Sequence, residues 1–382
     1  MVRVLTASRV FTGSTILVDG WVAVEGPSIV AVGSGPVSAD FSAVPVRALG
    51  DVVLAPGFVD IHCHGGGGVA FGDGEDVVGQ ARVALATHRR HGTTTLVGSL
   101  VTDSLDGLAG SISALAPLVV SGELAGLHLE GPWLSPAQRG AHTPSLLRVP
   151  EPAEVAGILD AHPGVVVMVT LAPELPGGLE AVRVCARRGV VAAFGHSDAS
   201  CEQVSAAIEA GVSNVTHLFN AMRPIHHREP GPIVPLLADE RVTVELICDG
   251  VHVHPSVVAH AMRVAGPGRV VFVTDAMAAT DMSDGRWELG GLAVDVRAGV
   301  ARLVEGGAIA GSTLTMDRAV QFAVHEAGVE LSDALAAATS TPAAVLGRTD
   351  VGVLAPGARA DMVVLDADVR VREVLSARDS VG

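Results

Sequence analysis

Histidine and acidic side chains recur in this sequence where apolar, β-prone segments end. The first example is Asp60-Ile-His62-Cys-His64, in which one residue separates two histidines. Alternate side chains of a β-strand point to the same side, so His62 and His64 would face one way and Cys63 the other. Two imidazoles on one face form a metal chelate. The side chains placed at such segment ends are His62, His64, Glu130, His196, His217 and Asp275.

Together these six side chains form a coherent set of ligands for a divalent metal. Imidazole nitrogen and carboxylate oxygen suit zinc, iron, cobalt and manganese. A metal lowers the pKa of bound water from about 16 to about 7 and so supplies hydroxide at neutral pH. A carboxylate such as Asp275 can then accept or return the proton. We therefore predict metal-assisted hydrolytic chemistry.

Taken one at a time, the same residues have simpler interpretations. A His-X-His pair occurs by chance, and Glu130 or Asp275 could cap a helix. His196 and His217 could be hydrogen-bonded polar residues of an ordinary core. Packing alone does not explain polar clusters at the ends of five separate predicted strands. The combined pattern favours the metal site.

The elements that would position these residues form a regular series. Several segments between the apolar ones are predicted helices, such as 151–161 and 201–210. The stretch Thr339-Ser-Thr-Pro342, with a capping hydroxyl and a Pro at the first helical position, predicts the start of another helix that closes the barrel. Buried parallel strands are continuous apolar runs, and eight βα units form a TIM barrel. The eight predicted strands are 59–64, 94–100, 124–130, 165–171, 190–196, 213–218, 242–248 and 270–274.

Both ends of the chain have a different composition pattern, with short β-prone segments separated by Gly and Pro. They occur at 2–6, 15–18 and 21–24, and again at 357–365. We predict one small β-sandwich built from both termini. The predicted domains are residues 1–53 and 350–382 for this sandwich and 54–349 for the metal-dependent barrel. The fold class is therefore α/β, a (β/α)8 TIM barrel with a small terminal β-domain.

The composition is that of a globular chain and excludes several classes of partner. Of the 382 residues, 49% are hydrophobic and 17% charged. The longest apolar runs, such as 165–172, are far shorter than the ~20 residues of a membrane span. The N-terminus lacks a signal-peptide pattern, so we expect a cytoplasmic protein. The net charge of −16 argues against nucleic acid and anionic membranes as partners.

Two residue types narrow the chemistry further. The sequence contains no lysine, which excludes Schiff-base catalysis and metal pairs bridged by a carbamylated lysine. An anionic substrate would therefore need arginine. The four cysteines form no CxxC pair, which indicates free thiols.

The motifs resemble those of the amidohydrolase superfamily and, within it, of the N-acetylglucosamine-6-phosphate deacetylase family. The resemblance covers nearly the whole chain. The His-X-His pair marks only the superfamily, whereas HLEGP, THLFNAM and AGSxLTM together are much more specific. The matching stretches are Ala55-Pro-Gly-Phe-Val-Asp-Ile-His-Cys-His-Gly65, His128-Leu-Glu-Gly-Pro132, Arg139-Gly-Ala-His142, Gly195-His-Ser-Asp198, Thr216-His-Leu-Phe-Asn-Ala-Met222, Cys248-Asp-Gly-Val-His252, Thr274-Asp-Ala-Met277 and Ala310-Gly-Ser-Thr-Leu-Thr-Met316.

The resemblance implies specific roles for these residues. Glu130, His196 and His217 would hold the main metal, zinc first and iron, cobalt or manganese as alternatives. Some members of the family lack the second histidine of the pair and hold one metal. This chain keeps both His62 and His64, so one or two ions per subunit are expected.

For catalysis, the resemblance makes Asp275 the general base and acid, and His252 the residue that polarises the acetamide carbonyl. A homodimer is expected, with Arg228 near the site of the neighbouring subunit. A loop from Trp133 to His142 could act as a lid. The residues expected at the substrate are Ala141, His142, Asn220, Ala221, Arg228, His252, Ile309, Ala310, Gly311 and Ser312.

The implied reaction is hydrolysis of the acetamide of N-acetyl-D-glucosamine 6-phosphate to glucosamine 6-phosphate and acetate, in amino-sugar catabolism and recycling. Two alternatives stay open at this point. One is another N-acyl amidohydrolase, such as a deacetylase of the galactosamine 6-phosphate isomer or an amino-acid deacylase. The other is a non-catalytic barrel that binds sugar phosphate, although a pure binder has no need of a metal site and Asp275.

Overall fold

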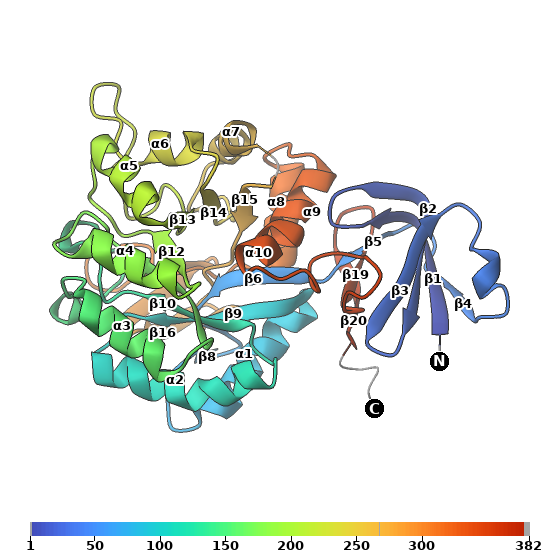
Figure 1. Cartoon of the computed structure of the whole chain (residues 1–382), viewed down its shortest axis with the longest axis horizontal. Coiled ribbons are helices and arrows are strands. Elements are labelled where there is room, and N and C mark those ends of the chain that lie inside the picture. Colours follow the sequence, from blue (N-terminus) through green and yellow to red (C-terminus); the bar gives the residue numbers. More distant parts are fainter. Residues whose placement is uncertain (1, 267, 378–382) are drawn as a thin grey trace.

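A computed structural model describes residues 2–266 and 268–377. It consists of a barrel surrounded by helices and a separate small sheet beside it (Figure 1). The first strand of the chain and its last two strands lie together in that small sheet (Figure 1). Among the described residues, every helix is too short or too polar to cross a bilayer.

Eight parallel strands form the barrel, and each overlaps one of the eight predicted segments. Their spatial order is β15-β14-β13-β12-β11-β10-β9-β6, and a parallel bridge between Cys63 and Ala276 lies where the first strand meets the end of the last. The predicted TIM barrel is confirmed. The barrel strands are β6 (Phe58–Cys63), β9 (Thr93–Val101), β10 (Gly126–Glu130), β11 (Val166–Leu171), β12 (Val191–Phe194), β13 (Val212–Val215), β14 (Thr243–Leu246) and β15 (Val270–Phe272).

Helices cover the outside of the barrel and share one large apolar core with its strands. Helix α5 occupies the predicted range, because Ser200 and Gln203 form a capping box at its start. The helices are α1 (Val77–Arg90), α2 (Leu105–Val120), α3 (Pro152–Ala161), α4 (Gly178–Arg187), α5 (Cys201–Ala210), α6 (Ile233–Ala238), α7 (Pro255–Ala265), α8 (Met316–His325), α9 (Leu331–Ala338) and α10 (Ser340–Val345), with 3₁₀ turns η1 (Ala39–Phe41), η2 (Pro136–Gln138) and η3 (Pro144–Leu146).

The predicted start of the last helix is wrong in detail. Helix α10 begins at Ser340, so Pro342 is its third residue rather than its first. The hydroxyl of Thr339 donates to the carbonyl of Leu335 in α9 and does not cap α10. The short link between α9 and α10 therefore uses Thr339 to close the preceding helix.

The chain ends form one seven-stranded sheet, as expected from their composition. Strand β19 pairs antiparallel with β5, with Met362 opposite Pro56 and Leu365 opposite Val53. An apolar cluster that includes Leu5, Val22 and Met362 forms its core. The predicted domain boundaries stay predictions. The strands are β1 (Val2–Phe11), β2 (Ile16–Glu25), β3 (Ser28–Ser34), β4 (Val46–Ala48), β5 (Val53–Pro56), β19 (Met362–Leu365) and β20 (Val371–Leu375).

An antiparallel sheet inserted after β15 was not predicted from the sequence. It contains β16 (Gly285–Leu289), β17 (Leu292–Arg297) and β18 (Val300–Leu303). Its apolar side packs on Met277, just beyond the eighth barrel strand, and on Val101 at the end of β9. The insert therefore lies against the carboxyl ends of barrel strands. A two-stranded ribbon, β7 (Gly65–Gly66) with β8 (Val69–Ala70), follows β6.

Candidate metal centre

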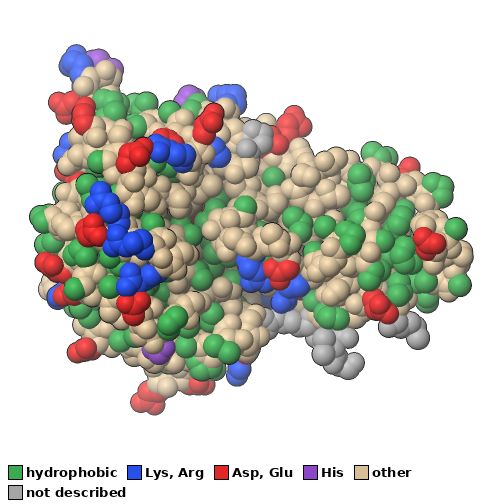
Figure 2. Space-filling view, in the orientation of Figure 1, with side chains coloured by type: hydrophobic (Ala, Val, Ile, Leu, Met, Phe, Trp, Pro, Cys, Tyr) green, Lys and Arg blue, Asp and Glu red, His purple; other side chains and the backbone are tan. Residues whose placement is uncertain are grey.

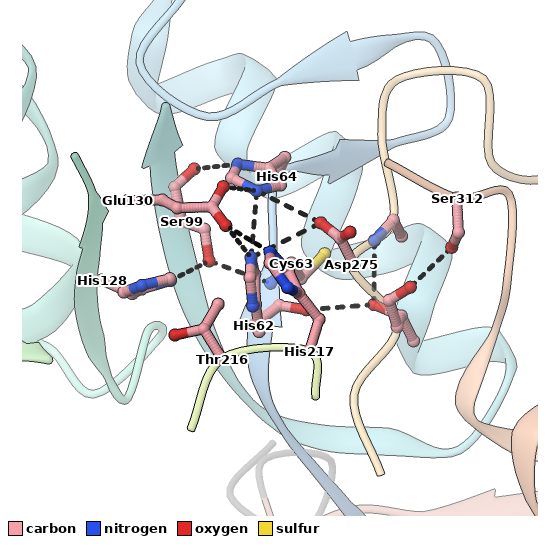
Figure 3. Close-up of polar contacts among 12 residues, drawn as sticks. His62, Cys63, His64, Ser99, His128, Glu130, Thr216, His217, Asp275 and Ser312 are labelled. Atoms are coloured by element: carbon pink, nitrogen blue, oxygen red, sulfur yellow. Dashed lines mark hydrogen bonds and ion pairs between the residues drawn. The ribbon is translucent and has the colours of Figure 1, made fainter. Parts of the chain in front are cut away.

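The six residues predicted as a metal site converge at the carboxyl ends of the barrel strands. Figure 3 shows five of them, namely His62, His64, Glu130, His217 and Asp275. His62 lies in β6 and His64 directly after it, and Glu130 is the last residue of β10. His196, His217 and Asp275 follow β12, β13 and β15 within three residues. All six side chains are buried. The barrel thus brings together groups that are up to 213 residues apart in the sequence, from His62 to Asp275.

Glu130 lies between two pairs of imidazoles. Its Oε2 is 3.0 Å from His64 Nε2, and its Oε1 is 2.9 Å from His217 Nε2 and 3.1 Å from His196 Nε2. Asp275 Oδ1 is 3.3 Å from His64 Nε2 and 3.4 Å from His62 Nε2. Glu130 is therefore shared by a half-site with His62 and His64 and a half-site with His196 and His217.

Hydrogen bonds on the far side of three rings fix which nitrogen faces the cluster. His64 Nδ1 donates to the carbonyl of Ser99 at 3.2 Å, and His196 Nδ1 donates to the carbonyl of Gln138 at 2.9 Å. His62 Nδ1 donates to Glu245 Oε2 at 3.0 Å. In each neutral ring, Nε2 then carries a lone pair that points into the cluster.

With the rings in their neutral, metal-binding form, the cluster is a convergence of hydrogen-bond acceptors. Lone pairs of His64 and His196 face the Glu130 carboxylate, and the Nε2 atoms of His62 and His64 lie 3.1 Å apart. Such contacts repel one another unless positive charge lies between them. Imidazole nitrogens with carboxylate oxygens are the donor set of a divalent transition metal. The residues fit a metal centre.

The pKa shifts in the cluster also indicate that its electrostatic field favours positive charge. Burial lowers the pKa of His64, but its hydrogen bonds with Asp275 and Glu130 outweigh this and raise it to about 9. Burial raises the pKa of Glu130, but the charge of His62 and the surrounding histidine hydrogen bonds hold it well below the usual value. The carboxylates thus favour positive charge at the His62–His64 half-site.

In the second half-site, the pKa of His196 is shifted in the opposite direction. Burial and the neighbouring charge of His142 lower the pKa of His196 to about 4. His196 is therefore a neutral imidazole near neutral pH, which is the form that binds a metal. His142 itself lies close by, with its Nε2 3.4 Å from Glu130 Oε2 and its Nδ1 2.8 Å from the hydroxyl of Thr102.

Three of the residues have backbone conformations that are rare outside glycine. The φ angles of His196, His217 and Asp275 are +47°, +30° and +49°. Such conformations cost of order 1–3 kcal/mol each and cluster at functional sites. The backbone N–H of Asp275 donates to the His62 carbonyl, and its own carbonyl accepts from Ser312 N–H. These bonds on both sides hold Asp275 in place.

A cavity of about 460 Å³ opens onto the cluster. It is lined by five of the six cluster residues, with His62 behind them, and by Leu289 of the inserted sheet. Arg139 is the only basic side chain among its described lining residues other than histidine. The residues predicted at the substrate that line it are Ala141, His142, Asn220, Ala221, His252, Ile309 and Gly311.

Three residues predicted at the substrate lie elsewhere. Ala310 is fully buried in the core of the inserted sheet. The hydroxyl of Ser312 donates to the Thr274 carbonyl at 2.5 Å, so it braces the backbone before Asp275. Arg228 lines a separate surface cavity, with its Nη1 2.8 Å from His227 Nε2. Trp133, considered as part of a lid, is fully buried in the core.

Comparison with known proteins places this site in a family. A model described as "Amidohydrolase family" matches residues 53–379. The chain belongs to the amidohydrolase family. It is 36% identical to N-acetylgalactosamine-6-phosphate deacetylase of Escherichia coli O157:H7, over 98% of both chains. It is 35% identical to N-acetylglucosamine-6-phosphate deacetylase of Vibrio furnissii, over 96% of this chain and 92% of that protein.

A solved structure is more similar still. A mutant N-acetyl-D-glucosamine-6-phosphate deacetylase from Mycobacterium smegmatis, in complex with N-acetyl-D-glucosamine-6-phosphate, is 48% identical over 98% of both chains. Its TM-score with this amidohydrolase is 0.94. The resemblance stated from the motifs is thereby confirmed at the level of family, fold and hydrolytic activity.

Sequence reasoning missed several supporting residues of this amidohydrolase. Asp249 accepts from His252 Nδ1 at 2.7 Å, and its position three residues earlier was a readable signal. Glu245 is an acidic residue within a predicted apolar strand, which was also a signal. The contact between Gln138 and His196 uses a backbone carbonyl, so no residue type could have revealed it.

A second buried group of potential ligands contains Asp60, Cys63 and His88. Cys63 Sγ lies 3.2 Å from His88 Nε2, on the opposite side of β6 from the paired histidines, as predicted. The Asp60 carboxylate accepts from the hydroxyl of Thr274 at 2.6 Å and from two backbone N–H groups. Its oxygens are thus occupied in joining β6 to the end of β15.

Proposed function

We propose that this amidohydrolase removes the acetyl group from N-acetyl-D-glucosamine 6-phosphate, releasing glucosamine 6-phosphate and acetate. The observation that carries the proposal is the cluster of His64, Glu130, His196, His217 and Asp275 on the wall of one cavity. The similar M. smegmatis protein with that sugar phosphate bound supports the substrate.

In this proposal Glu130, His196 and His217 hold a divalent cation, zinc first, and His62 with His64 can hold a second. When bound, such a cation acidifies water and polarises a carbonyl oxygen. The set of nitrogen and oxygen donors supports this choice over Mg²⁺ or Ca²⁺, which prefer oxygen ligands throughout.

Asp275 carries out the proton transfers in the proposed reaction. As the water oxygen adds to the acetamide carbon, Asp275 accepts a proton from that water. When the C–N bond breaks, Asp275 returns the proton to the departing amine, so acetate and a free amino group result. Burial raises the pKa of Asp275, but the charge of His62 and the hydrogen bond and charge of His64 outweigh it and lower the pKa. The carboxylate is therefore ionised and ready to accept.

His252 is the proposed contact for the acetamide carbonyl. Its Nδ1 lies 2.7 Å from Asp249 Oδ2, so its Nε2 is the nitrogen left for the cavity. A contact to a carbonyl oxygen then requires a ring that carries protons on both nitrogens, with Asp249 as its counter-ion. Asn220 and Ala221, on the same cavity wall, are the proposed neighbours of the sugar.

We further propose a cytoplasmic homodimer in which Arg228 reaches the neighbouring subunit's phosphosugar. The segment between β13 and α6 projects away from the barrel (Figure 1), and basic and histidine side chains lie at its tip (Figure 2). Arg228 belongs to this segment and lines no part of its own subunit's site cavity. Within residues 2–266 and 268–377 no ion pair joins Arg228 to a carboxylate, so this projecting arginine is available to a second copy.

The experiment that tests the proposed function is acetate release from N-acetylglucosamine 6-phosphate, with metal analysis of the same sample. The galactosamine isomer is assayed beside it, because two similar relatives are named as deacetylases of that isomer. We expect a higher kcat/KM for the glucosamine substrate. No acetate from either sugar phosphate, in protein that contains stoichiometric metal, contradicts the proposal.

A further inference from the structure

Strand β14 contains a buried carboxylate, Glu245, to which the proposed deacetylation assigns no role. Glu245 lies inside the barrel at 0% exposure, in a strand that is otherwise apolar apart from Thr243. A carboxylate away from water is costly unless several donors compensate it. The chain has no lysine, and within the described residues no ion pair joins Glu245 to an arginine. Its burial therefore requires a specific explanation.

The contacts of Glu245 connect it to both half-sites. Its Oε2 accepts from His62 Nδ1 at 3.0 Å and from the backbone N–H of His217 at 3.2 Å. Its Oε1 accepts from Asn214 Nδ2 at 2.7 Å. One carboxylate thus holds a ring of the first half-site and the backbone of a residue in the second.

The bond to His62 determines what that ring offers to the cluster. An ionised carboxylate only accepts, so the neutral His62 ring keeps its proton on Nδ1 and directs the Nε2 lone pair toward Glu130 and Asp275. The ring of His128 packs edge-on against His62, with centroids 4.6 Å apart, and limits its rotation. Carboxylates behind metal-binding histidines fix tautomer and orientation in this way.

The bond to His217 acts on a strained backbone. His217 has a φ of +30°, and the Glu245 contact satisfies its N–H in that conformation. Its Nδ1, by contrast, is buried without a hydrogen-bond partner among the described residues. The orientation of the His217 ring therefore depends on how its backbone is held.

We propose that Glu245 is a positioning residue that aligns the two half-sites with each other, setting the His62 tautomer and the His217 backbone for cation binding. The proposal rests on the metal centre of the proposed function, and it does not depend on which sugar is hydrolysed. If Glu245 only filled space in the core, cation affinity would follow the stability of the fold and nothing more.

The first test variant is Glu245→Gln, with Zn²⁺ affinity measured by competition with a chelator and thermal unfolding measured on metal-free protein. The amide keeps the volume but turns one acceptor into a donor that faces Asn214. We expect Zn²⁺ affinity to fall roughly 10–100-fold, the range for loss of such a contact. Wild-type Zn²⁺ affinity in this variant overturns the proposal.

A second variant separates positioning from packing. Asn214→Ala removes the donor to Glu245 Oε1 and a buried contact, but it leaves the bonds from His62 Nδ1 and His217 N–H to Glu245 Oε2 in place. Tm of this variant should fall while its Zn²⁺ affinity stays near the wild-type value, because the contacts that position both half-sites are kept. This variant also tests the proposal if Glu245→Gln does not fold. A loss of Zn²⁺ affinity in step with the loss of Tm contradicts the proposal.

Glu174→Gln is the matched control. Glu174 accepts from the Ser197 hydroxyl and from Asp198 N–H, both at 2.7 Å, so it braces the loop after His196 without touching an imidazole. Its substitution should leave Zn²⁺ affinity near the wild-type value. Because Zn²⁺ is the probe and no sugar is present, failure of this test and failure of the proposed deacetylation remain distinguishable.

Discussion

At the scale of single residues, the orientation of the proposed metal-binding groups depends on backbone as much as on side chains. His64 and His196 are oriented by the carbonyls of Ser99 and Gln138, which are present whatever residue occupies those positions. Only His62 relies on a side chain, that of Glu245. Substitution of Glu245 is therefore expected to change the orientation of His62. Substitutions at 99 or 138 should leave the backbone hydrogen bonds to His64 and His196 in place.

The proposed proton transfer predicts the behaviour of Asp275→Asn. An amide cannot accept the proton of the attacking water, so kcat should fall by at least ~10²-fold. Asp281→Asn is the control, because Asp281 forms a partly exposed ion pair with Arg90 at 2.7 Å, outside the cavity. Near-normal kcat in the Asp275 variant removes that residue from the mechanism.

The basic lining of the cavity predicts how the sugar phosphate is held. Arg139 lines the cavity, and it forms no ion pair with a carboxylate among the described residues. Loss of a charge-assisted hydrogen bond costs ~1.5–3 kcal/mol, so Arg139→Met should raise KM for the phosphosugar about 10-fold or more. KM for unphosphorylated N-acetylglucosamine should be unchanged, and Arg263→Met on the exposed side of α7 serves as control. An equal rise for both sugars contradicts a phosphate contact.

At the scale of elements, the sequence predicted what depends on local patterns and missed what depends on packing. The barrel strands were readable because both faces are buried, so each is an apolar run ending in polar residues. The strands of the inserted sheet β16–β18 are short and alternate polar and apolar residues. This range was therefore predicted as part of the barrel domain and not as a separate sheet. That sheet brings Leu289 to the cavity, a position that no motif indicated.

The convergence of the residues at the strand ends could be predicted from the sequence. The residues of the outer, substrate-facing part of the site were predicted less well. His62, Glu130 and His217 were identified because strand ends meet at one face of a barrel, which requires no knowledge of side-chain packing. Arg228 and Ser312 were placed at the substrate by motif alone, and neither lines the cavity of its own subunit. Their positions depend on loop paths, which sequence patterns determine poorly.

The hairpin of the inserted sheet predicts a stability effect. Gly290 and Gly291 form a two-residue turn with φ of +53° and +77°, and a Cβ on Gly290 would lie 2.9 Å from Val101 Cγ2. Gly290→Ala should destabilise the protein by about 1–2 kcal/mol. Gly110→Ala in α2, where a Cβ meets open space, should be neutral or stabilising. The check is thermal unfolding, and equal Tm changes for both variants contradict the argument.

At the scale of the whole molecule, the metal centre connects elements that are distant in the sequence. The proposed ligands come from β6 and β10 and from the segments after β12 and β13, with Asp275 after β15. A cation bound there stabilises the folded barrel, since the unfolded chain has no such cluster.

Metal removal should therefore lower the unfolding temperature. A ligand at 100 times its Kd contributes ~2.7 kcal/mol, which corresponds to a Tm change of roughly 3–5 °C in a domain of this size. Chelator treatment should lower Tm by that amount, and added Zn²⁺ should restore it. The same titration on Glu130→Gln should give a much smaller shift, because Glu130 touches both half-sites. Equal shifts in the two proteins indicate binding elsewhere.

The proposed dimer makes a prediction that only two subunits together can satisfy. Asp275→Asn leaves Arg228 intact, and Arg228→Met leaves the Asp275 carboxylate intact, so each homodimer alone should be slow on the phosphosugar. After the two proteins are mixed and exchange subunits, the Arg228→Met subunit receives an arginine from its partner. With random exchange, half of the dimers are mixed and each has one complete site, so activity should recover to about a quarter of wild type.

The measurement is acetate release before and after exchange, with oligomeric state followed in parallel. If stable mixed dimers form and activity does not rise, Arg228 acts within its own subunit or not at all, and its position outside that subunit's cavity favours the latter.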